Sequence, residues 1–552
     1  MWYDSKLPGT EIFCVHKYGK DGERTELKMK VKLDFFQVLL TLYLYLISYF
    51  YTLSVPLSWT TPMRLIVIYI CVHLACCGIQ KIRIEIRKEP GKKNWKFGLT
   101  VFCMVFLVMG IYYLAYYPGG LLTDTFNQWY QVDKGYFVDW HPAIHTLLFL
   151  KLPSMLINSL AFVNFMDMFW ISLGMGYLGM VLECWGIRKR WCMLILAVSI
   201  LTPASVIVNS FCWKDTALTI FMIVLVGQLI EIVFSDGKWL DNWLHVLVFA
   251  LCGALASLMR HNAILLTGPM MFLAAVLFIR KIGYKSAVAI VMMFAMMAGI
   301  KGPVYQVLHV QNHPQVSAEM LGLPMTILAN VLVNEPESLD AEARDFLYKI
   351  GDQEMWENTY REGNWNSAKY MGDDISDDVI EEEGAANVLR YTLHAVQRQP
   401  YLAYRAVVKL FELVLSPAGN NASWGFNIKV YEGNSYGYKL EGISWLQKIL
   451  DRSYDLSVNG GILLTLGWHI GFYVLLLLIW GVALIKRGWK WTIFWVPVIC
   501  YNFGTALLLC GPDFRFFSFN TVVTLPILLA MSCSQNEKME DENEIFDRNS
   551  ML

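Results

Sequence analysis

The chain has 552 residues, of which 56% are hydrophobic and only 16% are charged. A soluble globular protein carries more charge on its surface, so the composition indicates an integral membrane protein. The formal net charge is −1, which does not favour nucleic acid as a partner. The cysteines show no zinc-like spacing, so we expect neither disulfides nor a cysteine-bound metal.

A helix needs about 20 apolar residues to cross the hydrocarbon core of a bilayer. The stretch 141–160 is apolar, but Lys151 and Pro153 interrupt it, so we expect a re-entrant or juxtamembrane helix there. The predicted fold is an all-α polytopic membrane protein with about twelve transmembrane helices, or thirteen if 141–160 also crosses. The twelve predicted spans are 34–57, 63–82, 97–117, 162–184, 192–212, 216–234, 243–260, 262–280, 284–302, 459–485, 491–510 and 516–533.

Lysine and arginine cluster in loops that a twelve-span arrangement places on one side of the membrane, and this side is then cytoplasmic. The clusters lie at 28–32, 81–96, 188–190, 280–285 and 486–490. The predicted regions are a cytoplasmic tail (1–33), a transmembrane region (34–302) with its first outer loop at 118–141, an extracytoplasmic insert (303–458), C-terminal transmembrane helices (459–533) and an acidic cytoplasmic tail (534–552).

The first outer loop has the pattern of a short interfacial helix. The Pro-Gly-Gly sequence at 118–120 ends the preceding helix, and Thr123 or Asp124 is placed to cap a new helix that ends at Gly135. We expect an amphipathic helix at headgroup level, and Pro142 can begin a second one. The aromatic residues of the first helix have helical spacing on one face: Phe126, Trp129 and Tyr130.

Asp124 has two interpretations. As a helix cap it needs no further function. As a general base it would take the proton from an acceptor hydroxyl held at the membrane edge. Nearby, His141 and His145 are four residues apart and could join Asp139 at a metal, although solvated histidines at a helix start explain the same pattern.

Further polar residues fall where apolar spans meet at the outer face. Lys214 and Asp215 begin a span, where an ion pair that reaches the interface and caps the helix explains them. Arginine can contact phosphate through two nitrogens and stays charged when partly buried. One lysine and two arginines at one depth therefore suggest a phosphate site, whereas each alone can anchor a headgroup. The other residues are Arg260, His261, Asn262, Asp513 and Arg515.

The insert is long enough to fold by itself, and its sequence predicts mainly helices. The run ESLDAEARDFLYKI is typical of an amphipathic helix, and the segment from Val379 to Pro417 predicts one or two more. Its aromatic residues could stack on sugars or form a core, and we expect a core: Trp356, Tyr360, Trp365 and Tyr370.

Five pieces of the sequence resemble, in order, a group of bacterial membrane proteins that looks like a branch of the GT-C-type glycosyltransferases. The resemblance covers most of the chain after about residue 97. It implies many transmembrane helices, interfacial helices in the first outer loop, and a sugar donor linked to polyprenyl phosphate that is used on the outer face. The pieces are YYPGGLLTDTFNQW, DWHPAIHTLLF, CWKDTAL, LMRHNAILL and PDFRFFSFNTVVTLPILLA.

The resemblance also implies roles for individual residues. An acidic residue of the first outer loop acts near the acceptor, and Asp124 is the position that matches. Many relatives carry two adjacent acidic residues there, whereas Asp124 lies between threonines, and no pattern identifies a particular sugar. Basic residues hold the donor phosphate, for which the best matches are Lys214, Arg260 and Arg515. We expect six further residues to contact substrate: Gln128, His141, His145, Asp215, His261 and Asn262.

The leading hypothesis is a glycosyltransferase of the cell membrane that transfers a sugar, with inversion, from a polyprenyl-phosphate donor to an envelope glycan or lipid. The sequence assigns it no cofactor or metal. The alternative is a transporter or flippase of a lipid-linked intermediate, which predicts paired repeats and charges at mid-membrane. A third hypothesis is a noncatalytic assembly protein, which would tolerate loss of Asp124, Arg260 and Arg515.

Overall fold

The computed structural model describes residues 13–18, 24–29, 34–53, 60–311, 316–369, 375–418 and 425–535. The chain divides into two compact units, Met1–Gly78 and Ile79–Leu552. In the first unit, strands β1 (Phe13–Tyr18) and β2 (Arg24–Met29) pair antiparallel, which the all-α prediction did not include. Helix α1 (Phe35–Ser48) meets α2 (Thr61–Lys81) where Gln37 Oε1 lies 3.0 Å from His73 Nδ1.

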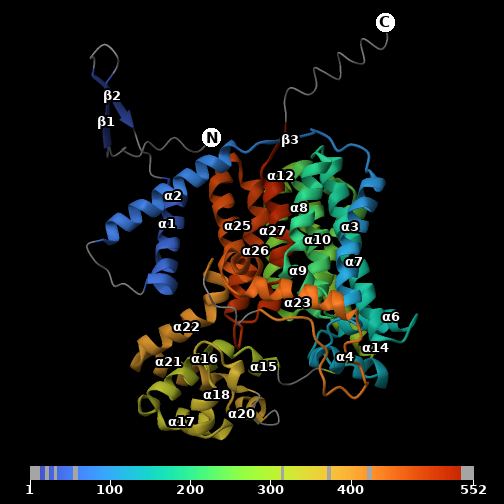
Figure 1. Cartoon of the computed structure of the whole chain (residues 1–552), viewed down its shortest axis with the longest axis vertical. Helices are drawn as coiled ribbons and strands as arrows, with labels where there is room; N and C mark the ends of the chain where they lie inside the picture. The colour runs from blue at the N-terminus through green and yellow to red at the C-terminus, as the bar shows by residue number, and fades with distance from the viewer. Residues whose placement is uncertain are drawn as a thin grey trace. The chain divides into compact units, whose positions relative to one another are not determined.

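The second unit contains a bundle of long helices (Figure 1). Nearly all residues of α10 and α27 are buried, whereas only three residues of α13 are, so α10 and α27 form the centre. Small residues allow α3 and α7 to approach closely, since a Cβ on Gly98 would lie 3.1 Å from the Gly176 carbonyl oxygen. The bundle helices are α3 (Trp95–Ala115), α7 (Leu160–Cys184), α8 (Lys189–Leu201), α9 (Pro203–Val208), α10 (Lys214–Phe234), α11 (Trp243–Met259), α12 (Ile264–Ile282), α13 (Lys285–Gly299), α25 (Ile470–Leu484), α26 (Thr492–Ala506) and α27 (Phe519–Met531).

Eight helices in the described part of the chain are long and apolar enough to cross a membrane. This agrees with a polytopic helical membrane protein. A helix lies over each of the twelve predicted spans, but α1, α11 and α26 are shorter. The span 459–485 is divided at His469 between α24 (Gly461–Trp468) and α25, and the span 192–212 is also divided. Its break falls at Thr202, because Pro203 has no N–H to continue the ladder of α8. The count of twelve therefore stays a prediction.

The stretch 141–160 contains one short helical segment. It runs from α5 (Ala143–His145) through η2 (Thr146–Lys151) to α6 (Leu152–Ser154). Twelve helical residues extend about 18 Å, which is less than the roughly 30 Å of the hydrocarbon core. The segment ends in an exposed apolar tip that consists of Leu152, Met155, Leu156 and Ile157.

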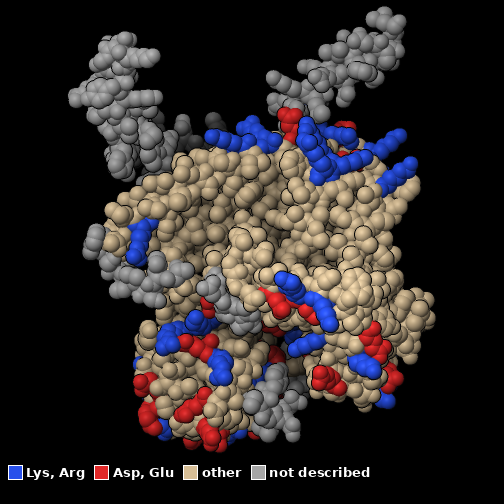
Figure 2. Space-filling model, in the orientation of Figure 1, with Lys and Arg blue, Asp and Glu red and all other residues tan. Residues whose placement is uncertain are grey.

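Basic loops meet at one end of the bundle, where Figure 2 shows lysine and arginine gathered over the helix ends. Lys281 and Lys490 both pair with Asp236, in the turn after α10. Lys93 Nζ lies 3.5 Å from Glu231 Oε1, near the end of α10. These contacts bring three of the predicted basic clusters to the end of the bundle at which α10 finishes. The opposite end, where α10 begins, carries the polar residues considered below.

The predicted insert consists of separate parts. Helix α13 continues through η5 (Ile300–Val304) and α14 (Tyr305–Val307), so the insert begins later than residue 303. Helices between residues 316 and 415 share a core in which Trp356 and Trp365 stack with their centroids 5.4 Å apart, and Tyr360 is also buried. This confirms the predicted aromatic core, and Tyr370 lies outside the described residues. The helices are α15 (Val316–Glu319), α16 (Gly322–Asn334), α17 (Ala341–Ile350), α18 (Gln353–Thr359), α19 (Asn366–Lys369), α20 (Ile375–Glu383), α21 (Ala385–Arg398) and α22 (Pro400–Leu415).

The rest of the predicted insert packs on the bundle. Residues 425–443, which we call the strap, have almost no regular structure and follow the first outer loop. The Tyr431 backbone N–H donates to the Leu121 carbonyl at 2.8 Å, and the Glu441 N–H donates to the Tyr117 carbonyl at 2.8 Å. Helix α23 (Ser444–Val458) follows, and Tyr116 at the end of α3 donates to its Asp451 at 2.6 Å. The strap therefore holds the first outer loop in place.

Candidate functional site

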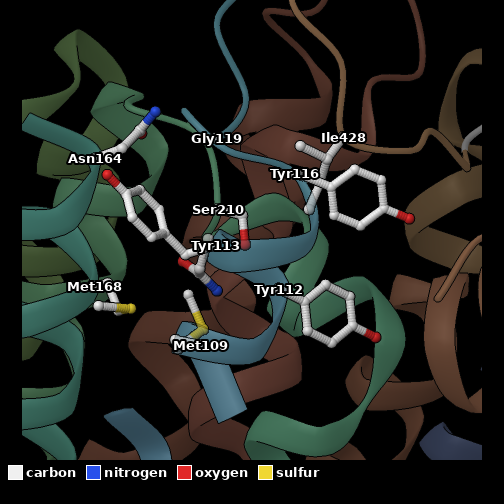
Figure 3. A pocket seen from close by; sticks show the side chains of 10 residues that line it. Met109, Tyr112, Tyr113, Tyr116, Gly119, Asn164, Met168, Ser210 and Ile428 are labelled. Carbon is white, nitrogen blue, oxygen red and sulfur yellow. The ribbon is translucent and has the colours of Figure 1, made fainter. Parts of the chain in front are cut away.

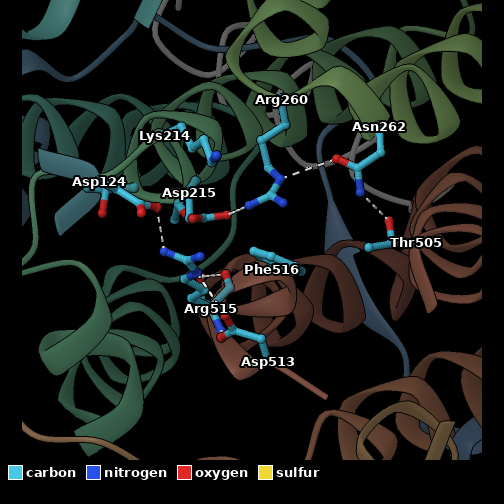
Figure 4. A network of polar contacts seen from close by, with 12 residues as sticks. Asp124, Lys214, Asp215, Arg260, Asn262, Thr505, Asp513, Arg515 and Phe516 are labelled. Atoms are coloured by element: carbon cyan, nitrogen blue, oxygen red, sulfur yellow. Dashed lines mark hydrogen bonds and ion pairs between the residues drawn. The ribbon is translucent and has the colours of Figure 1, made fainter. Parts of the chain in front are cut away.

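Four chain segments bring charged side chains together at the end of the bundle where α10 begins (Figure 4). Asp124 lies in the first turn of α4 (Thr123–Lys134), and Lys214 and Asp215 begin α10. Arg260 follows α11, and Arg515 lies in η9 (Phe514–Phe517), just before α27. The three predicted phosphate-binding residues thus lie in one cluster with Asp124.

Asp124 forms an ion pair with Arg515. Arg515 Nη1 donates to Asp124 Oδ2 at 2.7 Å, and its Nε donates to Asp513 Oδ2 at 2.8 Å. Burial alone would raise the pKa of Asp124, but the positive charges of Arg515 and Lys214 lower that pKa below its ordinary range. The N-cap residue of α4 is Leu122, without a side-chain cap, so the prediction that Thr123 or Asp124 caps this helix is wrong.

Asp215 and Arg260 form a second, more deeply buried ion pair. The guanidinium of Arg260 lies over the Phe516 ring, 4.0 Å from its centroid, which favours a cation that is shielded from water. Arg260 Nε also donates to Asn262 Oδ1 at 3.2 Å. The other oxygen of Asp215, Oδ2, is buried and accepts no hydrogen bond within the described structure. It is therefore an available acceptor in the wall of the site.

Lys214 differs from the two arginines. Its Nζ lies 3.1 Å from His141 Nδ1, and among the described residues it makes no salt bridge to a carboxylate. Burial, and then the charge of Lys214, lower the pKa of His141 from 6.5 to about 3. His141 is therefore neutral at physiological pH, and its Nδ1 accepts a hydrogen bond from the ammonium group. Lys214 is the cation best placed to accept a new anionic partner.

Gln128 and His145 lie beneath this cluster and are almost completely buried. Gln128 Nε2 donates to His145 Nδ1 at 2.9 Å and to Thr146 Oγ1 at 2.8 Å. Burial, and then the charge of Lys214, lower the pKa of His145 from 6.5 to about 3. We therefore place Gln128 and His145 among the residues that support the site, although the sequence predicted contacts with substrate.

Asp139 and His261 take part in a second group of polar contacts, which joins the first outer loop to the segment after α13 and to the residues after α11. Asp139 Oδ1 accepts a hydrogen bond from the Ala143 N–H at 2.9 Å and lies 3.3 Å from the Tyr305 hydroxyl, while Oδ2 pairs with Lys301 at 3.3 Å. His261 Nε2 lies 3.1 Å from the Asp139 carbonyl oxygen. Asp139 thus joins the first outer loop to the end of α13. It does not join His141 and His145, which are buried and not solvated.

No group of three or more metal-ligating side chains is present in the described ranges of the chain. The cluster contains three cations, Lys214, Arg260 and Arg515, and three carboxylates, Asp124, Asp215 and Asp513. It is therefore balanced in charge before any ligand binds. An incoming anion must therefore displace a carboxylate from one of the arginines, or bind Lys214.

Comparison with models of known protein families, with curated proteins and with solved structures gives no significant match. The chemistry of the site must therefore be argued from its own residues.

Sequence reasoning missed two residues around the cluster, and a third, Asp167, inside the bundle. Trp213 and Phe516 flank the Arg515 guanidinium, whose central carbon lies 5.2 Å and 5.1 Å from their ring centroids. Trp213 directly precedes Lys214 in the sequence, and Phe516 directly follows Arg515. Asp167, on α7, is almost completely buried and lies next to the Cys212 thiol. A carboxylate inside an apolar span is itself a signal of function, and it could have drawn attention to Asp167.

A small cavity lies between α3, α7 and the segment that follows α9, and it does not suit a substrate (Figure 3). It leaves about 10 Å³ for the centre of a water-sized sphere, which is room for about one water molecule. Tyr113, Asn164 and Asn209 are among the residues that line it. Its buried amide oxygens, Oδ1 of Asn164 and Oδ1 of Asn209, have no described donor, so a water molecule would satisfy them.

Proposed function

We propose that this protein is a membrane glycosyltransferase that uses a polyprenyl-phosphate-linked sugar on the extracytoplasmic face. The observation that carries the proposal is the contact between Asp124 and Arg515, because it places a carboxylate beside an assembled group of cations. A donor of this kind needs cations for its phosphate and a base for the acceptor hydroxyl, within one site.

The distribution of charge supports the orientation that the proposal requires. The basic loops lie at the end of α10 opposite to the cluster, and such loops favour the cytoplasmic side. We therefore place both termini in the cytoplasm and the predicted insert 303–458 outside, in a fold of twelve spans. A lipid phosphate at the outer headgroup level would then lie at the depth of Lys214, Arg260 and Arg515.

Donor binding would activate Asp124 by taking Arg515 from it. In the ion pair, Asp124 is a weak base because Arg515 holds its pKa low. A donor phosphate that accepts from Arg515 Nη1 leaves Nε on Asp513 and frees the Asp124 carboxylate. Asp124 thus becomes a stronger base only when the donor is present.

The transfer step then follows. The acceptor hydroxyl oxygen attacks the anomeric carbon, and its proton passes to Asp124. The bond between the anomeric carbon and the phosphate oxygen breaks, and polyprenyl phosphate leaves with the electron pair. Lys214, Arg260 and Arg515 stabilise the charge that develops on this leaving group.

A transporter or flippase is less well supported, because the cations and carboxylates of the cluster lie at the helix ends on one side of the bundle. Alternating access around a central site favours charged groups near mid-membrane. Both this alternative and a noncatalytic assembly role predict no chemical turnover of the donor.

The direct test is to reconstitute the purified protein in liposomes with a panel of polyprenyl-phosphate sugars and an envelope extract as acceptor, and to measure released polyprenyl phosphate. Asp124→Asn should reduce the turnover at least about a hundredfold, because a positioned base is typically worth about 10²–10⁴-fold. Transport of intact donor without release would contradict the transferase.

Asp513→Asn is the matched control, because Asp513 is the other carboxylate on Arg515. Both substitutions remove one charged hydrogen bond from the same guanidinium, and we expect similar losses of stability of about 1 kcal/mol, since both carboxylates are partly exposed. Asp513→Asn should retain most of the turnover at saturating donor. Equal turnover in the two variants would show that Asp124 serves only as an ion-pair partner of Arg515 and not as a base.

A further inference from the structure

Two exposed tyrosines and a half-buried third one form an aromatic face on and beside α4. Tyr130 on α4 and Tyr136 just after it are 45% and 42% exposed, and their rings meet edge to face with centroids 6.1 Å apart. Tyr436 of the strap has Tyr130 and Asp133 as neighbours. The sequence placed Tyr130 on one helix face with Phe126 and Trp129, and in the structure these two residues are buried whereas Tyr130 is exposed. We call Tyr130, Tyr136 and Tyr436 the tyrosine face.

The tyrosine face is continuous with Asp124 along α4. Asp124, Asn127 and Tyr130 are three residues apart in turn, so they lie along one side of the helix. Asn127 is exposed between the other two. The helix rises about 1.5 Å per residue, so Tyr130 lies about 9 Å along the axis from the proposed base. An acceptor whose hydroxyl reaches Asp124 would extend over this face.

The tyrosine face is built before any ligand binds. Tyr436 stacks on the buried Phe126 with the ring planes 9° apart and the centroids 6.2 Å apart. The strap that carries Tyr436 is fixed to the first outer loop by backbone hydrogen bonds at Leu121 and Tyr117. Ordered rings lose little conformational freedom when a ligand covers them.

The neighbouring side chains favour a carbohydrate over lipid. Asp133 and Lys134 are about half exposed and pair with each other at 3.3 Å, and Asn127 adds an exposed amide. Sugar rings present C–H groups that pack on aromatic faces and hydroxyls that bond to carboxylates and amides. The exposed apolar tip at 152–157 has instead the composition of a lipid-facing surface.

We propose that the tyrosine face binds the carbohydrate part of the acceptor and directs its hydroxyl to Asp124. This inference rests on the proposed function, and it narrows the acceptor from an envelope glycan or lipid to a glycan chain. Asn127 and Asp133 would bond to its hydroxyls, while Tyr130, Tyr136 and Tyr436 would pack on its rings.

The test uses the full chain in nanodiscs and a panel of soluble probes, namely hexasaccharides of glucose, N-acetylglucosamine and mannose in α and β linkage. Saturation-transfer difference NMR should detect binding of at least one of them. The triple variant Tyr130→Ala, Tyr136→Ala, Tyr436→Ala should weaken its affinity about tenfold or more, because three ring contacts are lost. Tyr401→Ala is the control, since Tyr401 is exposed on the distant α22.

Two results would overturn the proposal. One is binding by no member of the panel, or equal binding by wild type and triple variant. The other is labelling of the α4 peptide in wild type by a photoactivatable phosphatidylcholine, which would place the tyrosine face in lipid. Donor turnover separates this inference from the proposed function, because a transferase with a non-carbohydrate acceptor would still release polyprenyl phosphate from the donor.

Discussion

At the residue scale, the two arginine–carboxylate ion pairs of the cluster differ in how deeply they are buried. Arg260 and Asp215 are almost completely buried, whereas Arg515 and Asp124 are each about one-fifth exposed on their side chains. A buried pair is strongly destabilised when one partner is removed, because the other charge is left without compensation. The exposed pair can be exchanged for a ligand at lower cost. We therefore expect the Asp215–Arg260 pair to remain intact as part of the site's structure. In the Asp124–Arg515 pair, we expect a ligand to replace Asp124 on the guanidinium.

A double-mutant cycle tests this division. Arg260→Met should lower the free energy of unfolding by about 3–5 kcal/mol, because Asp215 then remains buried and ionised. The double variant Asp215→Asn, Arg260→Met should recover a large part of that loss, because no uncompensated charge remains. Denaturant titration in mixed micelles measures both. Additive effects would show that the two residues do not stabilise each other.

Two buried histidines of the candidate site predict how stability depends on pH. The folded-state pKa values of His141 and His145 are about 3, against an ordinary 6.5, so the unfolded chain binds protons that the folded chain does not. Stability should therefore be fully present above pH 6.5 and decline toward pH 3. His145→Gln should reduce the fall in melting temperature between about pH 8 and about pH 5. His309→Asn, at an exposed histidine, should leave that fall unchanged.

At the element scale, the strap decides where the first outer loop lies. Backbone hydrogen bonds from Glu441 and Ile443 attach it to the end of α3, and Gly442 between them packs against the Ala115 carbonyl without space for a Cβ. Tyr438 also accepts a hydrogen bond from the Leu160 N–H at 3.0 Å, which links the strap to the start of α7. The strap is therefore part of the scaffold of the site, although it has little regular structure.

Gly442→Ala should detach this end of the strap. The added Cβ would meet backbone atoms, which cannot rotate away, so we expect faster proteolysis within 425–443 and a lower melting temperature. Gly110→Ala on α3 is the control, since nothing lies within 4 Å of its added Cβ, and it should be neutral or slightly stabilising. Unchanged proteolysis in Gly442→Ala would show that the strap does not depend on this contact.

At the scale of the whole second unit, the asymmetry of charge predicts the orientation in the membrane. Glu337, with 87% of its side chain exposed, belongs to the predicted outer insert, and the exposed Lys92 belongs to the basic end. In intact cells, an impermeant maleimide should label Glu337→Cys and should label Lys92→Cys only after permeabilisation, each above the signal of the native cysteines. The reverse pattern would invert the topology and remove the basis for an outer-face reaction.

The sequence by itself determined the class of protein and the location of its helices. Apolar segments of sufficient length predict helices in a membrane, because backbone groups in lipid must be hydrogen-bonded within each segment. Each predicted span contains helix for this reason, and Gly135 ends α4 with φ +70°, as a left-handed cap requires. The sequence also placed four charged residues in one region, because all of them lie at the outer ends of predicted spans: Asp124, Lys214, Arg260 and Arg515.

Only the tertiary structure decided how those residues are paired. Local sequence rules made Asp124 a helix cap, but Arg515, 391 positions away along the chain, provides a stronger partner. The resemblance implied that Gln128, His141 and His145 contact substrate, whereas all three are buried in the structure. Tyr130 is exposed although Phe126 and Trp129 on the same helix are buried. Such pairings depend on contacts between distant segments, and no local periodicity contains them.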